Sequence, residues 1–510
     1  MSAHKTIFLG FDLGTTGLKV SLLDDNGRLI GSQHYDYPIH SPQPGYAEQD
    51  AHAWWGGFVY CCRALAEQHP AEFAEIVGIG LCGQMHTQVY LDDRGEVLRP
   101  AITWMDQRAT AIVEAINKDS AARALVFQET ANFATTTYTA PQVQWVKENQ
   151  PEVWEKTAYV LIAKDYIKYK LTGQLVTDDS EASGTLLFDT RKRAWSDAMF
   201  DFFDISQQRF PAVAPADEII GHVSAEAARV TGLRAGVPVA NGSTDNSASA
   251  LGAGMIHAGQ VTLIIGTAGV ISVCSDRPLP DSQGRTLCWD YCLRDKWITL
   301  GITQTAGESL NWFRNAFDRA DAGAPEEGGD IFEQYNEAIA GVADGSDGLI
   351  FLPYLNGERT PYWDPFARGV FYGVNLSTQK AHFIKAIMEG VSFALRHNIE
   401  TVESLGITVD QVRAVGGGLR SQAWLNILGK VLGKPIVTVS APDTANLGNA
   451  LLCGRALGRF TDLDAAVAEM VTTDQSMNFG RPAEVYDRQY EIFLEIYERL
   501  EGTFKRAASL

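Results

Sequence analysis

A carboxylate followed by a glycine- and threonine-rich turn stands near the start of the chain, as Asp12-Leu-Gly-Thr-Thr-Gly17. Small residues let the backbone N–H groups of Gly14, Thr15 and Thr16 approach an anion, and the threonine hydroxyls add further donors. The Asp12 carboxylate, at the end of an apolar segment, can hold Mg²⁺, usually through water. A single turn of this kind is more often only a turn, so both interpretations stay open here.

Two further glycine turns follow apolar segments later in the chain. Gly266-Thr-Ala-Gly269 follows the segment 261–265, and Gly416-Gly-Gly418 lies between a predicted strand at 412–415 and a helix that opens near Arg420. A glycine run between strand and helix lets the phosphates or ribose of a nucleotide approach the backbone. Three such turns, divided between two halves of the chain, indicate a nucleotide site. No Walker A sequence is present, which disfavours a P-loop NTPase.

Candidate residues for a phosphate acceptor follow other predicted strands. Asp245 comes just after the predicted strand 237–240, where open α/β sheets place their active residues. Its carboxylate could accept a hydroxyl proton as a general base, or it could cap the helix that follows, and the two roles are compatible.

A second strand end carries Gly83-Gln-Met-His86, so Met85 and His86 could contact a polyol. A lone histidine is more often an ordinary hydrogen-bonded residue. Trp104 offers an aromatic face that suits the apolar side of a sugar. These three residues are therefore candidates for the acceptor side of the site.

The elements that would position these residues alternate between strand and helix, which predicts an α/β fold. Strands are expected at 6–11, 18–23, 76–81, 159–162 and 237–240, and a helix from about Asp50. The strand–turn–strand pattern of the N-terminus recurs at 261–269, which indicates two lobes of related fold. We expect an N-terminal lobe at 1–254 and a C-terminal lobe at 255–510, with an exposed loop at 321–329 and a final amphipathic helix from Glu484.

The composition excludes several classes of partner. The 510 residues include 42 basic and 62 acidic ones, a net charge of −20, which argues against nucleic acid or an anionic membrane. No signal peptide and no apolar run of membrane length is recognisable. The seven cysteines are an odd number, and no second Cys or His pair accompanies Cys288 and Cys292. We therefore expect reduced thiols and a cytoplasmic protein rather than a cysteine metal site.

Several motifs resemble those of the FGGY family of carbohydrate kinases, over nearly the whole chain from Asp12 to about Arg459. Gly369-Val-Phe-Tyr-Gly373, with 382–383 and 386–389 after it, is similar to the family's C-terminal signature. The segment 138–145 is similar to the N-terminal signature, except that Gln142 stands where a lysine is usual. The segments 83–86, 245–246, 357–361 and 416–421 look most like the xylulokinase branch of the family.

The resemblance implies two actin-like (ribonuclease H-like) lobes, with the active site in the cleft between them. It implies Asp245 as the catalytic base, Asp12 as a Mg²⁺ and phosphate residue, and ATP and Mg²⁺ as cofactors. The residues near the sugar would be Met85, His86, Trp104, Asp245 and Asn246. Beside the turn at 14–16, those near the nucleotide would be Gly266, Thr267, Gly307, Asn311, Gly417 and Gly418.

Two departures from the xylulokinase pattern lie close to the expected acceptor pocket. Thr87-Gln88 stands where small residues are usual, and Ser243-Thr244 replaces glycines before Asp245. Either departure could reshape the pocket.

The expected activity is ATP-dependent phosphorylation of a primary hydroxyl, that of D-xylulose first. The alternatives are another acceptor, such as ribulose, L-xylulose, gluconate, glycerol or erythritol, and an ATPase of the actin or chaperone type. An acidic acceptor would need a cation in the pocket, and the sequence identifies none. A homodimer is expected from the family alone.

Overall fold

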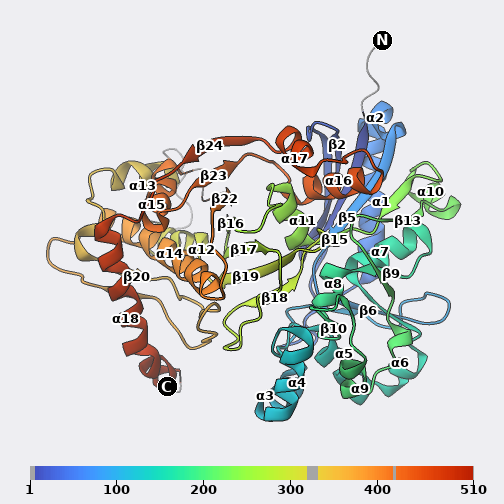
Figure 1. Cartoon of the computed structure of the whole chain (residues 1–510), viewed down its shortest axis with the longest axis horizontal. Helices are drawn as coiled ribbons and strands as arrows, with labels where there is room; N and C mark the ends of the chain where they lie inside the picture. Colours follow the sequence, from blue (N-terminus) through green and yellow to red (C-terminus); the bar gives the residue numbers. More distant parts are fainter. Residues whose placement is uncertain (1–5, 319–330, 417, 419–420, 509–510) are drawn as a thin grey trace.

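The computed structural model describes residues 6–318, 331–416, 418 and 421–508, so the loop predicted at 321–329 lies outside the described residues. Two seven-stranded sheets dominate the architecture, one built from each half of the chain (Figure 1). Helices pack around both sheets, and the α/β prediction is confirmed. Among the described helices, none combines the length and apolar character that crossing a membrane requires.

The first sheet has the order β13-β14-β5-β1-β2-β3, with β15 also paired to β5. Its strands are β1 (Ile7–Leu13), β2 (Gly17–Asp24), β3 (Leu29–Asp36), β5 (Ile76–Gly83), β13 (Ile219–His222), β14 (Pro238–Ala240) and β15 (Ser243–Thr244). β1 is antiparallel to β2 and parallel to β5.

The second sheet repeats this arrangement, with the order β18-β19-β17-β16-β22-β23-β24. Its strands are β16 (Gln260–Ile265), β17 (Gly269–Ser275), β18 (Leu287–Asp290), β19 (Trp297–Thr303), β22 (Gln411–Val415), β23 (Ile436–Val439) and β24 (Thr473–Met477). β16 is antiparallel to β17 across the Gly-Thr turn and parallel to β22. The repeat seen in the sequence is therefore a repeat of sheet topology.

Smaller sheets and the helices complete the described fold. The small sheets contain β4 (Glu48–Gln49), β6 (Gln88–Leu91), β7 (Ala101–Ile102), β8 (Tyr159–Ile162), β9 (Val176–Asp178), β10 (Phe188–Asp189), β11 (Ala194–Trp195), β12 (Ala212–Ala214), β20 (Ile350–Leu352) and β21 (Val370–Tyr372). The helices of the first half are α1 (Ala51–Gln68), α2 (Pro70–Ala74), α3 (Thr110–Lys118), α4 (Ser120–Thr130), α5 (Thr139–Asn149), α6 (Pro151–Lys156), α7 (Ala163–Thr172), α8 (Asp179–Ser183), α9 (Asp197–Phe203), α10 (Ala225–Thr231) and α11 (Asp245–Gly252). Those of the second half are α12 (Gly307–Phe317), α13 (Ile331–Ile339), α14 (Lys380–Glu403), α15 (Gln422–Leu432), α16 (Thr444–Ala456), α17 (Leu463–Met470) and α18 (Glu484–Ala507).

Helix α16 comes from the second half of the chain, yet it packs against α11, β5 and β1 of the first sheet (Figure 1). The close approach requires glycine in the strands. A Cβ at Gly10 would lie 2.7 Å from Asn446 Oδ1, and one at Gly80 would lie 2.2 Å from the Asn449 carbonyl oxygen. On the other face of the sheet, Phe11 packs edge-on against Phe58 of α1. β1 is thus covered on both faces, which explains its nearly continuous apolar sequence.

Candidate active site

The turn between β1 and β2 is held by side chains from three other segments. The Tyr37 hydroxyl donates to the carbonyl oxygen of Gly14, and Gln49 Nε2 donates to that of Thr15 over 2.5 Å. The indole N–H of Trp104 donates to Thr15 Oγ1 over 3.1 Å. The backbone N–H of Tyr37 donates to the Thr16 carbonyl oxygen over 3.2 Å. The turn predicted to bind phosphate is therefore held in place, and it directly contacts Trp104, which is predicted to contact the sugar.

Asp12 lies at the end of β1, beside a cavity of about 810 Å³ that Lys19, Gly416 and Asp443 also line. The Cys82 thiol donates to Asp12 Oδ1 over 3.4 Å. Loss of surrounding water, reinforced by the charge of Asp443, raises the pKa of Asp12 to about 6, and Lys19 only partly opposes this. Negative charge is thus concentrated at the position where the sequence predicts a cation.

Asp245 is the first residue of α11, directly after the short strand β15, which the sequence analysis did not separate from the preceding loop. The helix is capped by the Thr244 hydroxyl, which accepts from the backbone N–H of Ser247 over 3.3 Å. The Asp245 carboxylate is therefore not the cap; one of its oxygens accepts from the backbone N–H of Asn246 over 2.7 Å. Burial and the nearby charge of Asp12 raise the pKa of Asp245 to about 7.

A cavity of about 950 Å³ brings the predicted acceptor residues together. Its lining includes Met85, His86, Trp104, Asp245 and Asn246, which the sequence predicts for the acceptor, together with Thr15 of the predicted phosphate turn. Their role in binding a sugar stays a prediction. Asn246 also links the two halves of the chain, because its Oδ1 accepts from the Ser272 hydroxyl of β17 over 3.2 Å.

His86 is a neutral ring in a left-handed backbone conformation, with φ of 65°. Burial lowers the pKa of His86 to about 4. Its Nδ1 contacts the carbonyl oxygen of Gly184 over 2.5 Å, so Nδ1 is the donor and Nε2 is left as an acceptor. The rings of Tyr138 and Trp289 pack edge-on against it, at 5.2 and 5.5 Å between centroids. These contacts fix one tautomer and one orientation.

The second half of the chain also lines this cavity with residues that the sequence analysis did not assign, among them Trp289, Gln304, Glu358 and Arg359. Glu358 Oε1 accepts from the backbone N–H groups of Gln304 and Arg359, and burial raises the pKa of Glu358 to about 8. Arg359 is the cation that the sequence does not identify, although it lies in the segment 357–361 that resembles the xylulokinase branch.

A third cavity, of about 620 Å³, gathers the predicted nucleotide residues of the second half. Its lining includes Gly266, Thr267, Gly307, Asn311 and Gly418, whereas Gly417 lies outside the described residues. The turn after β16 and the start of α12 touch directly, with the Gly307 N–H donating to the Gly266 carbonyl oxygen over 2.8 Å. A Cβ at Gly307 would lie 2.6 Å from that oxygen, so the contact requires glycine.

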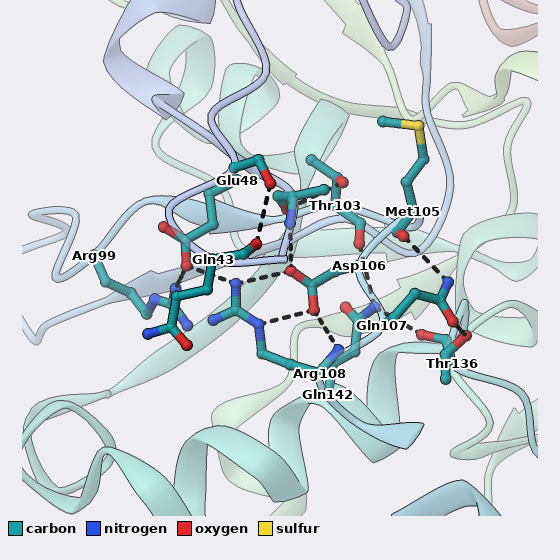
Figure 2. A network of polar contacts seen from close by, with 12 residues as sticks. Gln43, Glu48, Arg99, Thr103, Met105, Asp106, Gln107, Arg108, Thr136 and Gln142 are labelled. Carbon is teal, nitrogen blue, oxygen red and sulfur yellow. Dashed lines mark hydrogen bonds and ion pairs between the residues drawn. The ribbon is translucent and has the colours of Figure 1, made fainter. Parts of the chain in front are cut away.

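A buried ionic network holds the loop that carries Trp104 (Figure 2). The Arg108 guanidinium forms two parallel bonds with Asp106, each of 2.8 Å, and a third with Glu48 of 2.7 Å. Glu48 also pairs with Arg99. The ring of Tyr46 lies 4.0 Å below the same guanidinium. Because a forked pair of this kind is directional as well as strong, it fixes the course of the loop on which Trp104 lies.

Within the described residues, no group of three or more His, Cys, Asp or Glu side chains is arranged to hold a metal ion. Mg²⁺ is commonly bound through one or two carboxylates together with water and substrate phosphates, so a site at Asp12 needs no such group.

Comparison with known proteins shows the family to which the chain belongs. The N-terminal domain model of the FGGY family of carbohydrate kinases matches residues 7–252, and the C-terminal domain model matches residues 261–457. A xylulose kinase of Escherichia coli (strain K12) is 32% identical over 498 residues, which cover 97% of this chain and 99% of that protein. A gluconokinase of Bacillus subtilis (strain 168) is 29% identical, with 98% and 97% covered.

Solved structures give the same result. The crystal structure of xylulose kinase from Rhodospirillum rubrum matches with a TM-score of 0.88 and 30% identity, covering 98% of this chain and 100% of that one. The crystal structure of gluconate kinase from Lactobacillus acidophilus matches with a TM-score of 0.90 and 26% identity, covering 98% and 99%. The chain belongs to the FGGY family of carbohydrate kinases and is a phosphotransferase that uses ATP and a sugar.

Proposed function

We propose that this enzyme transfers the γ-phosphoryl group of ATP to the 5-hydroxyl of D-xylulose. The main support for the proposal is the position of Asp245. Its carboxyl lies in a cavity lined by polar and aromatic side chains, and its pKa is raised to about 7. A base is most effective when its pKa lies near the working pH. Xylulose kinases are prominent among the curated relatives, at 26–32% identity.

Asp245 acts as the general base. As the sugar hydroxyl oxygen forms its bond to the γ-phosphorus, the bond from that phosphorus to the bridging oxygen of ADP breaks, and the hydroxyl proton passes to Asp245. The neutral His86 ring and Asn246 orient the acceptor, and the Trp104 face excludes water from one side of it. Water would otherwise compete as a nucleophile.

The residues around Asp12 fit a divalent cation. The charge of Asp443 helps to raise the pKa of Asp12, and the charge of Asp12 helps to raise the pKa of Asp245. A cation bound with ATP would relieve this repulsion between carboxylates. Bound Mg²⁺ would neutralise charge on the transferred phosphoryl group. Asp12 would hold it, and the N–H groups of the turn at 14–16 would face the phosphates.

In this proposal each of the two lobes binds mainly one of the two substrates. Residues 1–254 supply the base and most acceptor contacts, and residues 255–510 supply the nucleotide cavity. The second lobe also reaches the acceptor cavity, through residues that include Trp289, Gln304, Glu358 and Arg359. We place the enzyme in the cytoplasm, which its seven free and buried thiols support. The homodimer stays a prediction.

Gluconate is the main competing acceptor, given the gluconokinase relative. Arg359 could pair with its carboxylate. However, Arg359 is the one cationic side chain among the described lining residues, against the carboxyls of Glu114 and Asp245; Glu358, whose pKa burial raises to about 8, is mostly protonated at neutral pH. This balance favours a neutral acceptor.

The test is a coupled ADP-release assay with Mg-ATP and D-xylulose, L-xylulose, D-ribulose, L-ribulose, glycerol, erythritol or gluconate. We expect kcat/KM to be highest for D-xylulose, by about tenfold or more over the next acceptor. Preference for gluconate would contradict the charge argument, and a lack of response to every acceptor would contradict the whole proposal.

A further inference from the structure

Two glutamines form a buried hydrogen-bonded pair behind the acceptor cavity. Gln88, at the start of β6, and Gln142, in α5, are both fully buried. Gln88 Nε2 donates to Gln142 Oε1 over 2.5 Å. Neither residue is among the described residues that line the acceptor cavity, so the pair does not contact an acceptor directly.

Three chain segments that line the cavity are hydrogen bonded to this pair. Gln88 Nε2 donates to the carbonyl oxygen of His86. Gln142 Nε2 donates to the carbonyl oxygen of Thr103, next to Trp104, over 3.2 Å. It also donates to the carbonyl oxygen of Thr136 over 2.8 Å (Figure 2). The His86 turn, the Trp104 loop and the segment before α5 are therefore tied to one another through two side chains.

The orientation of both amides is fixed by these contacts. The two N–H bonds of Gln142 are used on Thr103 and Thr136, and those of Gln88 on His86 and Gln142. Rotating either amide by half a turn would bring carbonyl oxygen against carbonyl oxygen. In a water-free interior, a lost partner leaves an unsatisfied polar group that costs about 1–3 kcal/mol. The pair thus has one favourable arrangement.

We propose that Gln88 and Gln142 are positioning residues that set the distance between the His86 and Trp104 sides of the acceptor cavity, and through it the choice of acceptor. The two residues were separate features of the sequence: Gln88 belongs to one departure from the family pattern, and Gln142 to another. In the structure the two departures are bonded directly to each other. The inference rests on the proposed function only in taking a sugar as the acceptor.

The experiment uses the full chain with Gln88→Met, Gln142→Met and the double substitution. Methionine keeps the length of glutamine and removes its donors. We expect each single variant to raise the acceptor KM about tenfold, to leave the KM for ATP within about twofold, and to lower the kcat/KM ratio of D-xylulose to D-ribulose about fivefold. The effect of the double substitution on the ratio should be smaller than the two single effects combined, because both single variants break the bond that joins Gln88 to Gln142.

Gln489→Met is the matched control. Gln489 is a buried glutamine of α18 that donates to the Gly345 carbonyl oxygen in the second lobe, so its loss should lower stability without changing acceptor kinetics. The proposal is overturned if the control changes the acceptor ratio as much, or if the Gln88 and Gln142 variants keep the wild-type ratio. Should the Met variants not fold, Gln142→Asn retains the amide on a shorter side chain, and the same fall in the ratio is expected.

Failure of the proposed substrate is distinguished by the wild-type enzyme. If it prefers an acceptor other than D-xylulose, the ratio is taken between its two best acceptors, and the outcome for the glutamine pair is judged on that ratio.

Discussion

At the scale of single residues, the site depends on carboxyl groups held where their charge is unfavourable. Asp12 and Asp245 lose water on folding and face further negative charge, which raises the pKa values to about 6 and about 7. Such groups bind protons or cations more readily than ordinary carboxylates do. This property suits Asp245 to accept a proton and Asp12 to sit beside a cation.

The first prediction concerns pH. Asp245 must be ionised to act as a base, so kcat/KM for the acceptor should increase with pH between 5 and 8, with a midpoint near 7. The measurement is the pH profile of kcat/KM at saturating Mg-ATP. A profile that is flat across this range would show that no group with this pKa limits the reaction.

The second prediction concerns stability. Folding raises the pKa of the Asp245 carboxyl from 3.8 to about 7, so the folded state binds this proton more tightly than the unfolded state does. The stability that proton binding adds is therefore complete below pH 3.8 and is lost as the pH increases through about 7. Asp245→Asn should therefore stabilise the ligand-free protein, by an amount that grows between pH 4 and pH 8 to roughly 1–3 kcal/mol. Its kcat should fall about 10²- to 10⁴-fold.

Urea unfolding at both pH values measures the first effect, and ADP release measures the second. Asp276→Asn is the control, because Asp276 is an exposed carboxylate that pairs with Lys296. If Asp245→Asn has no more effect on stability at pH 8 than at pH 4, the ionised Asp245 carboxylate does not destabilise the folded state.

At the scale of elements, the glycine turns and strand ends were predictable because local sequence determines them. The turns after β1 and β16 lie where the sequence predicts, and β22 ends at Val415 as predicted, whereas part of the turn after it lies outside the described residues. Trp289 and Arg359 were not predictable as cavity residues, since only the packing of distant strands brings them to the site. The Gln88–Gln142 bond was hidden for the same reason, as the partners are 54 positions apart.

The third prediction tests the contact between the β16 turn and α12. In Gly307→Ala, the new Cβ would lie 2.6 Å from the Gly266 carbonyl oxygen, so the two segments must separate. We expect the KM for ATP to increase about tenfold, with less than a twofold change in acceptor KM. Gly341→Ala is the control, because a Cβ there would meet no atom within 4 Å. An unchanged KM for ATP in Gly307→Ala would mean that this cavity does not bind the nucleotide.

At the scale of the whole molecule, the halves of the chain are joined by more than a single connection. α16 returns from the second half to cover the first sheet, where Asn449 Nδ2 donates to the Phe11 carbonyl oxygen over 2.9 Å. Asp443, which caps α16, accepts from the Ser21 hydroxyl over 2.8 Å. α16 is buried along most of its length and so lacks a clear helical periodicity, and nothing in the sequence assigns it to the first sheet. α16 thus belongs to the second half in sequence and packs with the first sheet in space, and the division at 254/255 stays a prediction.

The fourth prediction follows from an acceptor cavity that draws on both halves. Trp104 and Asp245 come from the first half, whereas Trp289 and Arg359 come from the second, so a ligand that contacts both should favour a closed arrangement of the lobes. We expect D-xylulose together with a non-hydrolysable ATP analogue to reduce the radius of gyration measured by small-angle scattering, more than either ligand alone. Closure driven by both ligands would also make their binding mutually favourable, so each should lower the dissociation constant of the other by the same factor. An unchanged radius with unchanged affinities would mean that the lobes are already closed in the free enzyme, and that water is excluded by the fixed walls of the cavity rather than by a movement.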